Sequence, residues 1–444
     1  MKRFFETLQN IWKIEELKQR ILTTLGLILI YRLGSYVVLP GIDTEVLAAA
    51  NANSNDGGIV ALINAFAGGA FSRASIFGLG IMPYITASII IQLLGMAVPY
   101  FQKMQKEGES GRKKINQYTR FLTVAVTAVQ APGYLAAQVY SKPGVVAIDH
   151  AWFGIQSTII LVAGTMFIMW LGERITDKGI GNGISILIMI GIISRLPFAI
   201  TSEFGARLQS AGGGLIVFLL EIVAILLIII SCILLVQGTR RVPVQYAKKI
   251  VGNKQYGGVR QYLPLKVNSA GVMPIIFAQA IMFIPNAIAN YNGNSGGIFS
   301  ERYGFWYNLI FAVLIIAFTY FYTAIMINPN QLADDMKRNG GFVPGVKPGK
   351  ATAEFIDQVM SRITLPGAIF LAFIAVLPSF ANQLKINSAF ADFFGGTSLL
   401  ILVGVVLDTL QQIETYLLNR HYDGLMQNGR LKGRASNQMT MQQA

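Results

Sequence analysis

The sequence carries very little charge for its length. Only 13% of its 444 residues are Asp, Glu, Lys or Arg, whereas a soluble globular protein carries about 25%. A single cysteine, Cys232, excludes an intrachain disulfide, and two distant histidines, His150 and His421, form no metal-binding cluster in the sequence. Hydrophobic residues make up 53% of the chain instead. Because a single soluble core stops growing near about 250–300 residues, so much apolar material indicates a membrane protein.

Ten apolar runs are each long enough to cross a bilayer, which takes roughly 20 mostly apolar residues. The predicted spans are Ile21–Leu39, Ile76–Val98, Phe121–Val139, Phe153–Leu171, Ile180–Ile200, Leu215–Val236, Gly271–Ile288, Tyr307–Ile327, Ile363–Phe380 and Thr397–Leu418. The first 20 residues are charged and lack the pattern of a cleavable signal, so we expect the first span to be retained.

The lysines and arginines are distributed unevenly between the two sides of these spans. Segments on the N-terminal side hold 29 of the 36, and the alternate segments hold 6. Cytoplasmic segments collect positive charge, so this split predicts an inner-membrane protein with both termini in the cytoplasm. The predicted parts are a cytoplasmic N-terminal segment, two halves and a cytoplasmic tail, at 1–20, 21–200, 201–418 and 419–444.

Two predicted cytoplasmic loops, 237–270 and 328–362, are long and basic. Their charge has two interpretations. One is the ordinary positive-inside bias together with contact to anionic lipids. The other is docking of a large anionic partner, which the length of the loops favours.

An internal repeat relates span n to span n+5. The segment Gly80–Ile85 resembles Gly271–Ile276, and Gly183–Ile188 resembles Gly396–Ile401. By the charge count, the two members of each pair run in opposite directions. The repeat therefore predicts two inverted halves of five helices, which is common among transport folds.

The matched positions of the repeat are all isoleucine: Ile85, Ile276, Ile188 and Ile401, with Ile81 and Ile184 one turn away. If these side chains converge, they form an apolar constriction that blocks ions by dewetting. They could instead pack helices together or face lipid. A secondary transporter, the alternative function, would place polar or ionic groups at this depth.

Seven dispersed motifs, in order along the chain, resemble the SecY family of protein-conducting channels. They are 72–77 (SRASIF), 81–85 (IMPYI), 106–112 (KEGESGR), 169–173 (MWLGE), 179–185 (GIGNGIS), 263–268 (LPLKVN) and 395–401 (GGTSLLI). The resemblance implies an all-α membrane fold of ten transmembrane helices in two pseudo-symmetric inverted halves of five, with an hourglass pore between the halves. It also implies a translocon subunit that passes unfolded preproteins and releases transmembrane segments into the bilayer.

The resemblance assigns roles to residues of this sequence. It implies a pore ring formed by Ile81, Ile85, Ile184, Ile188, Ile276 and Ile401. It implies a plug at about 59–71, which includes Ile59, Leu62, Ile63, Phe66, Gly68 and Gly69. A surface amphipathic turn is the alternative for this small, apolar segment.

A lateral gate is expected between spans two and seven, which are symmetry partners in the repeat. The residues expected at this seam are Thr86, Gln92, Gln130, Asn268 and Ile284. In lipid the polar ones would bond across helices, unless each is satisfied within its own helix.

The resemblance further implies partners: a SecE-like single-span subunit, a SecG-like third subunit, a SecA motor, the ribosome, unfolded preproteins with their signal sequences, and membrane lipids. Docking of the motor or ribosome is expected at Arg240, Arg241, Lys254, Arg260 and Lys347. Lys347 stands where the family usually has arginine, so the charge is kept and the bidentate fork is lost.

No catalytic constellation is evident in the sequence, and we expect neither an enzyme nor a cofactor. The glycine-rich segment at 179–183 lacks the strand that a phosphate-binding loop requires. ATP hydrolysis is therefore expected in the partner motor. Two ionisable groups, Glu221 and Asp408, lie in or near apolar runs, and such groups mark functional sites unless they reach the interface at helix ends.

Overall fold

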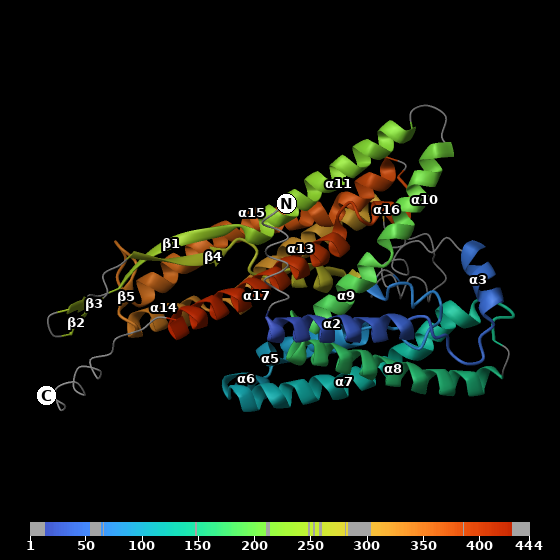
Figure 1. The fold of residues 1–444 in the computed structure, drawn as a ribbon, viewed down its shortest axis with the longest axis horizontal. Coiled ribbons are helices and arrows are strands. Elements are labelled where there is room, and N and C mark those ends of the chain that lie inside the picture. The colour runs from blue at the N-terminus through green and yellow to red at the C-terminus, as the bar shows by residue number, and fades with distance from the viewer. Residues whose placement is uncertain are drawn as a thin grey trace.

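Helices dominate the structure because a chain in lipid must satisfy its backbone polar groups internally. The computed structural model describes residues 14–53, 64, 66–146, 149–209, 214–246, 249–251, 254–256, 260–279, 281–282, 303–384 and 386–428. Figure 1 shows α2, α5, α7 and α8 gathered in one half of the molecule, and α11, α13, α15 and α17 in the other. Helix α9 lies between them and contacts α2, α8 and α17.

The first half contains α2 (Glu15–Gly34), α3 (Thr44–Asn53), α5 (Met82–Ala97), α6 (Pro99–Lys106), α7 (Glu109–Leu135), the π-helix η1 (Ala136–Tyr140), α8 (His150–Lys178) and α9 (Gly183–Ile193). The second contains α11 (Gly214–Gln237), α13 (Phe305–Met326), α14 (Pro329–Arg338), α15 (Lys350–Gln383), α16 (Ser388–Ala391) and α17 (Gly396–Asn428). The predicted boundary at residue 200 falls inside α10 (Leu196–Gln209), which packs against α11 and α16 of the second half.

Seven helical stretches of the described residues are long and apolar enough to cross a membrane: Glu109–Tyr140, His150–Lys178, Gly183–Gln209, Gly214–Gln237, Phe305–Arg338, Lys350–Gln383 and Gly396–Leu417. They correspond to seven predicted spans. The helix Met82–Gly95 covers most of the second predicted span, and the helix Pro99–Gln105, bent from it by 101°, begins just beyond the predicted end at Val98. Helix α2 covers most of the first, but Lys18, Arg20 and Arg32 interrupt its apolar character. Much of the seventh lies outside the described residues, so the count of ten stays a prediction.

Several helices continue beyond their predicted apolar spans. Helix α7 begins at Glu109 rather than Phe121, α15 begins at Lys350 rather than Ile363, and α17 runs on to Asn428. The added turns are polar and charged, which is why a reading based on hydropathy excludes them.

The internal repeat is visible in local geometry. Gly80 and Gly271 both adopt left-handed backbone conformations, with φ of 56° and 62°. A helix begins two residues after each, at Met82 and at Met273. The second matched pair behaves alike, because α9 begins at Gly183 and α17 at Gly396. Matched sequence positions therefore have matched structure in the two halves.

Strands are the main departure from an entirely helical chain. In the two long basic loops, β1 (Thr239–Tyr246) pairs antiparallel with β4 (Arg260–Lys266) and with β5 (Gly341–Phe342). A second antiparallel pair joins β2 (Lys249–Val251) and β3 (Lys254–Tyr256). Figure 1 shows β1 and β4 extending away from the helical halves, alongside α14 and the start of α15.

The sheet has its own hydrophobic core. Val242 and Val244 are buried and alternate with exposed residues along β1, as the two-residue period of a strand requires. They pack with Leu265 of β4 against buried residues of α14 and α15, including Met336 and Ile356. We call the unit of β1, β4, β5, α14 and the first turns of α15 the loop domain. The two basic loops therefore form one folded unit.

Candidate pore, plug and docking surface

The predicted pore isoleucines converge. Five of the six lie in a single hydrophobic cluster: Ile81, Ile188 and Ile401 are buried members, and Ile85 and Ile184 pack against them. These residues come from α5, α9, α17 and the turn before α5. Branched apolar side chains from both halves thus meet in one place.

The sixth, Ile276, is half-buried and lies one turn beyond Val272. Val272 packs against the isoleucine cluster and also against the core of the second half. The helical segment that begins at Met273 therefore starts at the boundary of the two cores. This placement is compatible with a role for Ile276 in the ring, which stays a prediction.

The glycine-rich loop before α9 docks on α17. The amide of Gly181 donates to Oε1 of Gln412 at 2.8 Å, and Asn182 caps α9 by accepting from the amides of Ile184 and Ser185. Gly181 has a φ of 78°, and a Cβ there would lie 3.1 Å from the hydroxyl of Thr409. Glycine is needed at this position both for the backbone conformation and for the close approach of α17. The loop thus orients the helix that carries Ile184 and Ile188.

The described part of the predicted plug sits on the same cluster. Phe66 is 7% exposed and belongs to the cluster that contains the isoleucines. A Cβ built at Gly68 lies 3.1 Å from both the Cα of Gly191 and the hydroxyl of Ser194, so the turn rests directly on α9. The other predicted plug residues, Ile59, Leu62 and Ile63, lie outside the described residues.

Backbone carbonyls of this turn accept hydrogen bonds from surrounding side chains. Arg32 and Arg73 donate to the carbonyl of Gly68. Tyr134 of α7 donates to Phe71 at 2.8 Å, and Asn51 of α3 donates to Ser72 at 2.8 Å. The turn is therefore fixed by several helices of the first half.

The residues expected at the lateral gate are bonded locally where the structure describes their bonds. The hydroxyl of Thr86 donates to Met82 at 3.1 Å, and the amide of Gln92 donates to Ser88 at 3.5 Å, both within α5. Gln130 is half-buried on α7. Asn268 is 9% exposed, and its Oδ1 accepts no hydrogen bond from the described residues. Ile284 lies outside the described residues, so the gate remains a proposal.

The docking residues belong to the loop domain and its hairpin. Arg240 and Arg241 are exposed on β1, and Lys347 is exposed in the turn between β5 and α15. Lys254 begins β3 and Arg260 begins β4. The buried hydroxyl of Thr352 donates to the carbonyl of Lys347 at 2.9 Å, which fixes the turn and leaves the ammonium group in solvent.

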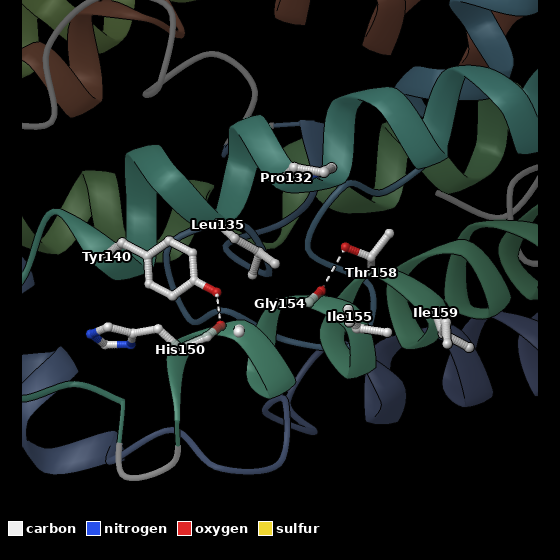
Figure 2. Close-up of a pocket in the computed structure, with 9 residues that line it drawn as sticks. Pro132, Leu135, Tyr140, His150, Gly154, Ile155, Thr158 and Ile159 are labelled. Carbon is white, nitrogen blue, oxygen red and sulfur yellow. Dashed lines mark hydrogen bonds between the residues drawn. The ribbon is translucent and has the colours of Figure 1, made fainter.

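A groove of about 420 Å³ lies between the end of α7 and the start of α8 (Figure 2). Its walls are mainly apolar, with Leu135 and Ile155 among them. At one end the hydroxyl of Tyr140 donates to the carbonyl of His150 at 2.9 Å. It shares no lining residue with the predicted pore or plug.

Glu221 is buried and ion-paired inside the protein. It is 4% exposed, and Nη2 of Arg207 contacts it at 2.6 Å. Arg207 also pairs with the buried Glu203 at 2.7 Å. Asp408, by contrast, is exposed. An internal ion-pair group thus joins α10 to α11.

Sequence reasoning did not identify Arg73 and Tyr36 beside the plug turn, or Gln412 beside the glycine-rich loop before α9. One signal was available: Arg32 interrupts an apolar run, and a charge in such a position needs a partner. The partner is a backbone carbonyl 36 residues away, which no pattern of side-chain types reveals.

The described residues thus form a helical protein whose repeated halves meet at one apolar cluster. The SecY family profile matches residues 75–410 of this chain. The protein translocase subunit SecY of Vibrio cholerae is 43% identical over 435 residues, covering 95% of this chain and 96% of the relative. That of Thermotoga maritima is 41% identical, covering 97% and 100%. The chain belongs to the SecY family.

Solved structures share the fold at lower identity. One concerns a plug domain of SecY that stabilises the closed state of the translocation channel and maintains a membrane seal. It superposes with a TM-score of 0.61 at 17% identity, covering 90% of this chain and 92% of that one. Sec61 in a canine ribosome-channel complex from the endoplasmic reticulum gives a TM-score of 0.57 at 17% identity, with the same coverage. The predicted fold class is confirmed.

Proposed function

We propose that this chain is the central pore-forming subunit of the general secretory translocon. It passes unfolded preproteins across the inner membrane and releases transmembrane segments sideways into the bilayer. The observation that carries this function is the single apolar cluster that joins five predicted ring isoleucines to Phe66 of the plug. A narrow apolar constriction excludes ions by dewetting and makes no sequence-specific contact with a passing chain.

A secondary transporter is the competing function. Its substrate site would need polar or ionic groups between the repeats. The repeat-matched positions carry isoleucine. The six predicted ring residues lie at the starts of the two matched helix pairs, which are α5 with the helix that begins at Met273, and α9 with α17. The chemistry of the constriction therefore supports passage of a chain rather than recognition of a solute.

The proposed partners follow from the family and from the loop domain. A SecE-like single-span subunit and a SecG-like third subunit complete the complex in the membrane, and a SecA motor or the ribosome docks on the cytoplasmic side. ATP hydrolysis belongs to the motor. The exposed Arg240, Arg241 and Lys347 stand on one folded unit, which presents positive charge to an anionic partner. Both termini lie in the cytoplasm in this arrangement.

The test is reconstitution of the chain with its small subunit in sealed vesicles. Addition of the motor, ATP and an unfolded preprotein should give protease-protected product. Replacing Ile85, Ile188 and Ile276 together with Asn should raise the ion conductance of the resting channel, because polar side chains let water enter the constriction. The matched control replaces the same three residues with Leu, which keeps the site apolar and should keep it sealed. A resting conductance that is equal in the Asn and Leu variants contradicts the ring.

A further inference from the structure

The plug turn is held at one carbonyl by two arginines. Nη1 of Arg32 donates to the carbonyl of Gly68 at 2.9 Å, and Nη2 of Arg73 donates to the same oxygen at 2.8 Å. Nε of Arg73 also donates to the carbonyl of Gly69 at 3.1 Å. Gly68 and Gly69 have φ of 62° and 86°, a left-handed conformation that turns both carbonyls toward the guanidinium groups.

Tyr36 brings the two cations together. The guanidinium carbon of Arg73 lies 4.2 Å from the centroid of its ring, and that of Arg32 lies 5.0 Å away. Nη2 of Arg32 also donates to the Tyr36 hydroxyl at 3.1 Å. Attraction to the ring face and to the carbonyl dipoles offsets the repulsion between the like charges.

Neither arginine forms an ion pair with a carboxylate of the described residues. Their acceptors are neutral, so separating them leaves no anion unpaired. A charge-assisted bond to a neutral oxygen is strong enough to hold a segment and can be exchanged for water when the segment moves.

We propose that Arg32 and Arg73 are positioning residues that latch the plug turn in its seated place through the carbonyl of Gly68. The proposal rests on the proposed function, in which this segment is a plug. Arg73 belongs to the turn and fixes its shape through the carbonyls of Gly68 and Gly69, while its guanidinium group also packs on the ring of Tyr36. Arg32 belongs to α2, so the turn cannot leave its seat on α9 without breaking the Arg32 bond. Arg32 is therefore the releasable member of the pair.

The first experiment measures the resting ion current of vesicles or bilayers that contain the complex, without preprotein. Arg32→Leu should raise the open probability about tenfold or more, as expected for loss of a hydrogen bond to a charged group. Arg32→Lys keeps the charge but loses the fork and should fall between wild type and Arg32→Leu. It also serves as the test variant if Arg32→Leu does not accumulate. The control is Arg174→Leu on α8. The guanidinium carbon of Arg174 lies 5.5 Å from the centroid of the Trp170 ring, outside the latch.

A rescue separates latching from a general folding role. A Cβ built at Gly68 lies 3.1 Å from the Ser194 hydroxyl, a separation that a disulfide between the two positions can span. The background carries Arg32→Leu and Cys232→Ala. Gly68→Cys places a side chain at a φ of 62°, a strain that is the same in the oxidised and the reduced protein, so the comparison is between these two forms. With Gly68→Cys and Ser194→Cys added, oxidation should lower the current and reduction should raise it again. A misfolded channel would not be resealed by a single bond.

Preprotein translocation by the wild-type complex in the same vesicles distinguishes failure of the latch from failure of the proposed channel function. If the wild type translocates, and Arg32→Leu and Arg32→Lys both remain as well sealed as Arg174→Leu, the latch is wrong and the channel function stands. If the wild type gives no protected product with motor and ATP, the proposed function fails, and the latch fails with it.

Discussion

At the scale of single residues, charged side chains inside this apolar protein have defined partners. Arg32 bonds a carbonyl and a tyrosine, while Arg207 bridges two glutamates. Glu203 is 1% exposed and also accepts from the amide of Asn387 at 2.9 Å. An isolated buried ion is far more costly than a paired one. Each such residue is therefore tied to the integrity of its site.

Removal of Arg207 tests this cost directly. Arg207→Ala leaves Glu203 and Glu221 buried beside each other without a cation and should destabilise the protein by about 3–5 kcal/mol. Arg120→Ala is the matched control. Its bidentate pair with Glu173 is 47% and 28% exposed, so solvent screens it and its loss should cost less than the loss of Arg207. The measurement is thermal unfolding in detergent.

The triple variant Arg207→Ala, Glu203→Gln and Glu221→Gln should recover part of the loss, because it removes both buried charges. Equal unfolding temperatures for Arg207→Ala and Arg120→Ala would show that the glutamates find other compensation.

The pore isoleucines were predictable at this scale, and the latch was not. Ile85 and Ile188 repeat in matched segments, so a one-dimensional comparison finds them. The contact of Arg32 with Gly68 depends on a left-handed glycine turn and on the fold of the chain between the two residues. Glycine content suggests such a turn, but it does not say which side chain approaches the carbonyl.

At the scale of elements, apolar runs predicted the cores of the long helices well. They did not predict where α7 and α15 begin, because polar helical turns outside the bilayer resemble loops in hydropathy. The strands were also missed. Val242, Val244 and Leu265 alternate with polar or exposed neighbours, which is a strand signal. In a loop identified only by its charge, that signal was not considered.

The loop domain yields a prediction about docking. Arg240→Glu, Arg241→Glu and Lys347→Glu, made together, should lower affinity for the motor or ribosome, and the difference from wild type should shrink at high salt because the attraction is screened. Binding of the purified complex to the motor is measured at low and high ionic strength. Arg112→Glu, Lys113→Glu and Lys114→Glu, made together on the exposed face of α7, control for the change in net charge because they also reverse three cations. Unchanged affinity in the triple variant would leave these cations a role in topology alone.

At the scale of the whole molecule, two halves with equivalent helix starts meet at one apolar cluster. Between the halves, the amide of Gly181 donates to Gln412, and the guanidinium carbon of Arg20 lies 5.1 Å from the centroid of the Tyr416 ring. The hydrogen bonds of Thr86 and Gln92 stay within α5. These two side chains therefore form no described polar bond to another helix at the expected seam between spans two and seven.

That seam gives the last prediction. In a Cys232→Ala background, Thr86→Cys and Ile284→Cys should cross-link on oxidation, because the repeat pairs their two spans. Thr86→Cys removes only a bond within α5, so folding should be preserved. Val129→Cys replaces it in the control pair, since Val129 is 79% exposed on α7 and should not reach Ile284→Cys.

The linked protein should fail to translocate preproteins and to insert membrane helices, and reduction should restore both, because a covalent bond across the gate prevents separation of the halves. Efficient cross-linking with undiminished secretion and insertion would place the exit elsewhere, and cross-linking of the Val129→Cys pair would show that span seven lies against a different face of the first half.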